Sequence, residues 1–218
     1  MHAKSHTPHA ASSQIEPKAR PKGQRTGFLM QFFRTPGQVG AIAPTSKWVA
    51  RKMTEGLHLD RAKLVVEYGP GNGTLTDEFV KAMGTRTKFF AIELSSEMAE
   101  LFRERHPRRR VYVGSAADIG RYAALEGFPA EHSVDVVVSA LPWTNFPPLL
   151  CSKILAATTR ALKPGGRFVT ICYSGSELTR GGRRFAKLLD RYFATVEKTP
   201  PVLRNVPPAF LYRCTTKA

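Results

Sequence analysis

A short apolar strand followed by a glycine-rich turn constrains this chain more than any other stretch. Leu64–Val66 are apolar and β-favouring residues that predict a buried strand. Gly69, Gly71 and Gly73 follow, and glycines let a backbone turn sharply and approach a ligand without a Cβ in the way. Residues 74–83 are expected to form a helix that opens from this turn. The succession of strand, turn and helix predicts a ligand-binding loop.

A second strand indicates a nucleoside cofactor. Phe89–Glu93 ends in a carboxylate about twenty residues beyond the glycines, the spacing of the ribose-binding acid in nucleotide-binding α/β folds. The glycine motif reads E-x-G-x-G-x-G, unlike the G-x-G-x-x-G of dinucleotide enzymes, and Glu67 is expected to face the ligand. A carboxylate is unfavourable beside phosphate but suits a cation that carries an ammonium and a sulfonium.

The charge of the chain predicts an anionic partner. Lys and Arg number 33 against 17 Asp and Glu, which gives a net charge of +16. Such a charge favours nucleic acid or an anionic membrane surface and does not choose between them. The three cysteines (Cys151, Cys172 and Cys214) are far apart in apolar contexts, so no metal site is expected. Without a membrane-spanning run or a signal peptide, the chain is expected in the cytoplasm.

Three regions are expected along the chain. Residues 1–26 are polar and basic, which predicts a disordered tail. Residues 27–61 are interpreted as a helical extension, and helical spacing gathers four apolar side chains on one face of its first segment: Phe28, Leu29, Phe32 and Phe33. Residues 62–218 alternate strands and helices. They predict an α/β domain with seven strands, mostly parallel, and an antiparallel last strand.

Five further strands and three further helices are expected after Glu93. After Glu93 the expected strands are 110–113, 134–139, 168–173, 194–197 and 209–213. The expected helices are 97–105, 148–162 and 183–192. Before the first strand, Thr45 or Ser46 is expected to cap a helix that ends near Leu57.

At this point the chain resembles the class I S-adenosylmethionine-dependent methyltransferases, which have a Rossmann-like fold. The resemblance implies Glu67 near the methionine end of the cofactor, the Gly69–Gly73 loop beneath the sulfonium and ribose, and Glu93 on the ribose hydroxyls. It implies further cofactor contacts from Thr45, Ser46, Leu94, Ser115, Ala116 and Ser139.

The adenine contact departs from the family pattern. After the third strand these enzymes usually carry Gly-Asp-Ala, and the Asp reaches the adenine amine. This chain has Gly114-Ser115-Ala116-Ala117-Asp118 instead. Either Ser115 takes over that contact more weakly, or Asp118 reaches in.

The methyl acceptor is expected at the carboxyl end of the fourth strand, where the strand order of such sheets reverses. Methyl transfer from a sulfonium is a direct displacement, so the protein has only to align the acceptor and exclude water. Adenine amino-methyltransferases carry Asn-Leu-Pro-Tyr or a close variant here, whereas this chain has Ala140-Leu141-Pro142-Trp143. The base-reading Asn is absent. The expected acceptor-site residues are Ser139, Leu141, Trp143 and Tyr173, of which Tyr173 either lines the pocket or packs beside it.

Five segments together are similar to bacterial phospholipid N-methyltransferases, which convert phosphatidylethanolamine towards phosphatidylcholine. They are residues 40–46, 67–73, 139–143, 162–168 and 204–210. The resemblance implies an enzyme held peripherally on the inner face of the membrane, with the segment before the fold docked on lipid. Arg180, Arg183 and Arg184 are candidates to contact lipid phosphates.

The alternative is an adenine N6-methyltransferase that acts on ribosomal RNA. The basic charge and the kinship of fold favour it. Ala140 in place of the base-reading Asn and the lack of a helical RNA domain after the last strand count against it. The expected function is therefore phospholipid N-methylation with S-adenosylmethionine.

Overall fold

The computed structural model describes residues 46–218, and every structural statement below concerns that part of the chain. The predictions for the basic tail, for the apolar segment Phe28–Phe33 and for Thr45 lie outside the described residues. The expected boundaries at residues 26 and 61 stay predictions.

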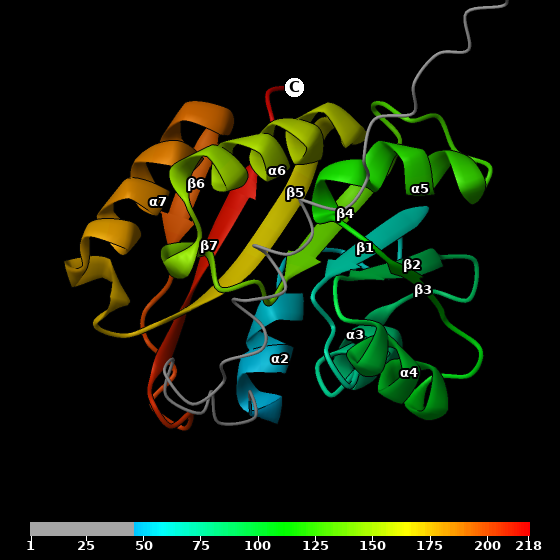
Figure 1. Ribbon diagram of the computed structural model, residues 1–218, viewed down its shortest axis with the longest axis horizontal. Helices are drawn as coiled ribbons and strands as arrows, with labels where there is room; N and C mark the ends of the chain where they lie inside the picture. The colour runs from blue at the N-terminus through cyan, green and yellow to red at the C-terminus, as the bar shows by residue number, and fades with distance from the viewer. Residues whose placement is uncertain (1–45) are drawn as a thin grey trace, which may run out of the picture. The chain divides into compact units, whose positions relative to one another are not determined.

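The centre of the domain is a seven-stranded sheet in the order β3-β2-β1-β4-β5-β7-β6 (Figure 1). The strands are β1 Leu64–Tyr68, β2 Lys88–Glu93, β3 Arg110–Val113, β4 Val134–Ser139, β5 Leu162–Tyr173, β6 Thr195–Lys198 and β7 Ala209–Thr215. β1 to β5 pair in parallel, and β7 runs antiparallel to both of its neighbours. The predicted mostly parallel sheet with an antiparallel last strand is confirmed.

Six α-helices cover the two faces of this sheet in the described part of the chain. They are α2 Lys47–Thr54, α3 Thr76–Ala82, α4 Ser96–Arg105, α5 Ile119–Leu125, α6 Pro148–Ala161 and α7 Arg180–Tyr192. Figure 1 shows α2, α3 and α4 on one side of the sheet and α5, α6 and α7 on the other. Because both faces are covered, the inner strands read as nearly continuous apolar runs, and all five residues of β1 are buried.

The alternation of side chains along the strands decides what each face of the sheet can hold. Val65 joins a core cluster with residues of α2, α3 and α4, whereas the Tyr68 hydroxyl lies 3.0 Å from that of Thr158 on α6. Tyr68 is paired with Ser139 in the sheet, so Ser139 also points towards α6. Glu67 and Glu93 point towards the α2–α4 side.

Two differences from the expected elements have local causes. Helix α5 was not predicted, because it has only seven residues, contains a glycine and buries only Ile119, Tyr122 and Ala123. Helix α7 begins at Arg180 instead of residue 183 because the Thr179 hydroxyl caps it by accepting from the Gly182 amide at 3.0 Å. No helix in residues 46–218 is long and apolar enough to cross a membrane.

Candidate active site

The loop between β1 and α3 needs glycine at each of its three predicted positions. Gly69, Gly71 and Gly73 have φ angles of 64°, 56° and 81°, in the region that side chains disfavour. A Cβ on Gly69 would lie 2.9 Å from the Leu141 side chain, and one on Gly73 would lie 2.5 Å from the His106 ring. On Gly71 it would meet nothing closer than 3.5 Å. The glycine loop therefore packs closely on two sides and is open at its middle.

Glu67 is a buried carboxylate with one oxygen left without a partner. Its side chain is 1% exposed, and Oε2 accepts a hydrogen bond of 2.6 Å from the Thr76 hydroxyl. Oε1 is buried and has no hydrogen-bond partner among the described residues. Desolvation by burial raises the pKa of Glu67 from its ordinary value of 4.5 to about 8, although the Thr76 hydrogen bond opposes the shift. A cationic ligand would supply the missing partner.

Glu93 organises the loop from the end of β2. Its side chain is 4% exposed, and its oxygens accept from the backbone amides of Gly71 at 3.1 Å, Leu94 at 2.8 Å and Ser95 at 3.1 Å. Burial raises the pKa of Glu93, and these three amides act against that rise. Glu93 thus holds the middle of the glycine loop, at the place where the sequence predicted a ribose contact.

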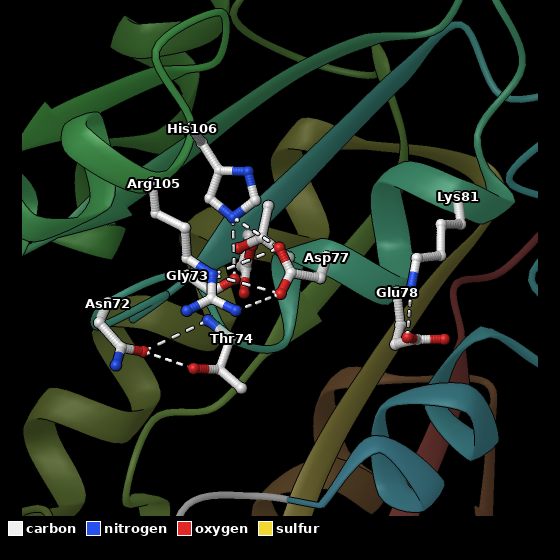
Figure 2. Close-up of polar contacts among 10 residues, drawn as sticks. Asn72, Gly73, Thr74, Asp77, Glu78, Lys81, Arg105 and His106 are labelled. Carbon is white, nitrogen blue, oxygen red and sulfur yellow. Dashed lines mark hydrogen bonds and ion pairs between the residues drawn. The ribbon is translucent and has the colours of Figure 1, made fainter.

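A polar network behind the glycine loop was not anticipated from the sequence (Figure 2). His106, which follows α4, places Nε2 2.9 Å from the Gly73 carbonyl oxygen and 3.3 Å from a carboxylate oxygen of Asp77 in α3. Arg105 pairs with the same carboxylate, and its hydrogen bond lowers the pKa of Asp77. His106 and Gly73 are 33 residues apart, so no local motif reveals this contact.

The end of β3 shows where the two candidate adenine contacts lie. The Ser115 hydroxyl accepts from the Ala117 amide at 3.2 Å and so caps a short 3₁₀ turn, Ala116–Asp118. Ala116 is buried and Asp118 is exposed. Ser115 is therefore already engaged with its own backbone, and both alternatives stay predictions.

Two of the predicted acceptor-site residues, Ser139 and Trp143, have buried side chains at the end of β4 and just after it. The Ser139 hydroxyl, on a residue 1% exposed, accepts from the Trp143 indole Nε1 at 3.0 Å on the α6 side of the sheet. Trp143 is 2% exposed, and its ring stacks on Phe185 of α7 with centroids 5.1 Å apart. The two side chains pack in the core on the face opposite Glu67, and their role at the acceptor site stays a prediction. The motif there fixes the shape of the loop.

The backbone and the neighbours of Trp143 remain available for an acceptor. Ala140 and Tyr173 are partly buried and pack against the core cluster on the α2–α4 side, the side of Glu67. The Leu141 carbonyl accepts from the Trp143 amide at 2.9 Å, whereas no hydrogen bond to the Ala140 carbonyl is present within residues 46–218. The Ala140 carbonyl is thus the candidate to accept a hydrogen bond from the N–H group of an amine.

Two hydrogen bonds of the Asn205 side chain join the start of α2 to the connection between β6 and β7. Asn205 is 2% exposed; its Oδ1 accepts from the Ser46 amide at 2.9 Å, and its Nδ2 donates to the Pro207 carbonyl at 2.7 Å. Nearby, the Arg204 guanidinium lies 4.6 Å from the ring centroid of Trp48. This brings Ser46, a predicted cofactor residue, to the edge of the sheet where the strands β1, β2 and β4 end.

These features define a class of protein. The strand order, the glycine loop and the two buried carboxylates at the carboxyl ends of β1 and β2 match the class I methyltransferase pattern, and residues 65–166 match the family model described as a methyltransferase domain. The chain is a class I S-adenosylmethionine-dependent methyltransferase. The unpartnered oxygen of Glu67 fits the cationic methionine end of this methyl donor.

Relatives with known names agree with the class. The chain is 28% identical over 190 residues to an ornithine lipid N-methyltransferase from Singulisphaera acidiphila, a match that covers 86% of this chain and 93% of that protein. It resembles an O-methyltransferase from Bacillus cereus, solved with S-adenosylhomocysteine, at 15% identity and a TM-score of 0.61, over 90% of this chain and 92% of that one. An O-methyltransferase from Thermotoga maritima gives 19% identity and 0.59, over 79% and 66%.

Proposed function

We propose that this enzyme methylates the amine of a membrane aminolipid, with phosphatidylethanolamine and its partly methylated derivatives as the expected acceptors. The observation that carries the proposal is the relative that spans nearly the whole chain and is named for N-methylation of ornithine lipid. Both lipids present an amine at the membrane surface. The acceptor edge supports the proposal, because Ala140 leaves it without the amide that would read a base.

The chain's own residues would act by placement. S-adenosylmethionine supplies an electrophilic methyl group when bound, and Glu67 would neutralise its ammonium end. The Ala140 carbonyl would accept a hydrogen bond from an N–H group of the acceptor and so orient the nitrogen lone pair for attack. A primary or secondary amine would give up one proton to water after it gains the methyl group, whereas a tertiary amine has no N–H to lose and would keep the positive charge. The amine must be unprotonated before it attacks.

The test is methyl transfer to separate acceptors. Full-length protein is incubated with cofactor labelled in the methyl group and with one of three pools: vesicles that contain phosphatidylethanolamine, vesicles that contain ornithine lipid, or ribosomal RNA. We expect label in a lipid amine. Label in ribosomal RNA and in neither lipid would contradict the proposal and favour the RNA alternative. A Gly71→Val variant, expected to lose cofactor binding, shows that transfer depends on this site.

A further inference from the structure

Large apolar side chains that are exposed gather around the edge of the sheet where the active site lies. Four of them are more than 70% exposed: Leu149 (83%), Leu178 (73%), Leu203 (75%) and Val206 (78%). Leu149 is in the first turn of α6, Leu178 lies two residues before the start of α7, and Leu203 and Val206 are in the connection from β6 to β7. All three places follow or precede strands at the carboxyl edge of the sheet. We call these four residues the apolar rim.

Contacts between these segments hold the rim together. A Cβ on Gly181, at the start of α7, would lie 1.9 Å from the Thr144 carbonyl oxygen, so α7 abuts the turn that leads into α6. Glu177, next to Leu178, pairs with Lys198 at the end of β6 at 3.1 Å. The Ser174 amide donates to the Pro208 carbonyl at 2.8 Å, which joins the end of β5 to the β6–β7 connection. Figure 1 shows the start of α7 and that connection at the same edge of the sheet, the edge where β5 ends.

Arginines beside the apolar rim carry positive charge that no nearby carboxylate of the described residues neutralises. Arg180, Arg183 and Arg184 in the first turns of α7 are exposed, and none of them pairs with a carboxylate within residues 46–218. Arg183 donates to the Leu178 carbonyl at 2.7 Å, which keeps a guanidinium directly beside a rim leucine. Arg204 adds a further exposed cation between Leu203 and Val206. Exposed apolar side chains interleaved with unpaired arginines suit a surface of anionic headgroups above acyl chains.

We propose that the folded domain docks on an anionic membrane through the apolar rim, with Arg180, Arg183 and Arg184 on lipid phosphates. The inference rests on the proposed function, because an enzyme that methylates a lipid amine must receive it from a bilayer. The apolar rim flanks the edge where Ala140 and Tyr173 lie, so a headgroup could enter while its acyl chains stay in the membrane. Docking through the rim is separate from the predicted contact of Phe28–Phe33, which precede the domain.

The first experiment replaces three of the four residues of the apolar rim. A Leu178→Ser, Leu203→Ser, Val206→Ser variant of the full chain is compared with wild type for sedimentation with vesicles of phosphatidylglycerol and phosphatidylethanolamine. We expect vesicle affinity to fall by about tenfold or more, because the serines no longer bury apolar surface in the membrane interface. The matched control is Leu125→Ser, an exposed leucine at the end of α5 away from this edge, and its affinity should equal that of wild type.

The second experiment tests the charges. Arg180→Glu, Arg183→Glu should weaken binding to anionic vesicles strongly at low salt and leave binding to neutral phosphatidylcholine vesicles unchanged. Lys187→Glu, Arg191→Glu, at the far end of the same helix, should have the smaller effect. Equal losses for the two pairs would mean that net charge alone attracts the protein, and would overturn the orientation proposed here.

An activity readout separates the rim from the proposed function. Wild type and the apolar-rim variant are assayed on phosphatidylethanolamine in vesicles and on a short-chain phosphatidylethanolamine dissolved in detergent. We expect the variant to lose activity only on vesicles and to keep its cofactor affinity. If the variant binds vesicles and methylates their lipid as well as the wild type does, docking through the apolar rim is overturned. Absence of methylation of either lipid form by the wild type would overturn the proposed function instead.

Discussion

At the scale of single residues, the chemistry of the site depends on the burial of Glu67. A carboxylate that is buried with one unpartnered oxygen is costly for the fold and favourable for a cationic ligand. Its raised pKa of about 8 means that the folded protein without cofactor holds a proton there at neutral pH. The unfolded chain loses that proton above its ordinary pKa of 4.5. The buried carboxylate of Glu67 therefore lowers the stability of the folded protein and favours the binding of a cationic ligand.

The contribution of Glu67 to the free energy of unfolding should fall as pH rises. Because the pKa of Glu67 is raised in the folded state, its contribution to the free energy of unfolding is present below about pH 4.5 and is lost as pH rises through about 8. Glu67→Gln should remove this slope, which is at most ~1.4 kcal/mol per pH unit. Denaturant unfolding of the protein without cofactor at pH 5 and pH 8.5 measures it. The variant should be the more stable protein at pH 8.5 and should bind S-adenosylmethionine more weakly; an unchanged slope would show that Glu67 does not titrate in this window.

Glu93 should matter for cofactor affinity through the loop and through the ribose. Glu93→Ala removes acceptors for three backbone amides and the predicted ribose contact, and we expect binding of S-adenosylmethionine to weaken by roughly 1.5–3 kcal/mol. Gly71→Val should weaken it as well, because φ there is 56° and the open side of the loop faces the predicted cofactor. Calorimetry measures both. Undiminished affinity in each variant would exclude this cofactor site.

At the scale of elements, side-chain ties between distant segments assemble the site. Asn205 connects the start of α2 with the β6–β7 connection, and its amide is buried. Asn205→Ala should leave the Ser46 amide and the Pro207 carbonyl without their partner and lower the free energy of unfolding by about 1–3 kcal/mol. The exposed Asn145→Ala serves as the control and should change stability little. Equal stability of the two variants would mean that this tie contributes nothing to the fold.

The strands and the glycine loop could be predicted because their signals are local. Arg110–Val113 and Val134–Ser139 agree with the sequence prediction at both ends. For Val134–Ser139 the reason is burial on both faces, which requires a nearly continuous run of apolar residues. The side-chain contacts of Ser139 and Trp143 could not be predicted. The face on which Ser139 lies follows from its pairing with Tyr68 and Thr170 in neighbouring strands, which no local pattern reveals. His106, Thr76 and Asn205 were missed for the same reason, because their partners are brought in by the fold.

At the scale of the whole molecule, the basic charge and the fold both favour an anionic surface as the partner of the edge proposed to hold the cofactor. The net charge of +16 is consistent with attraction to an anionic surface, and among the described residues unpaired arginines lie beside the apolar rim at the edge that carries the cofactor site. The same charge would attract RNA, so binding to anionic material does not discriminate between the two acceptors. Only the identity of the methylated product does so.

The most direct test of the central claim is a competition between acceptors in one reaction. Wild type and Ala140→Asn receive labelled S-adenosylmethionine together with phosphatidylethanolamine vesicles and ribosomal RNA, and the label is separated by phase extraction. We predict that wild type labels the lipid amine, and that Ala140→Asn, which places a larger side chain beside the acceptor, lowers that yield without raising label in RNA. Label in RNA with none in lipid for the wild type, increased by Ala140→Asn, would contradict the account.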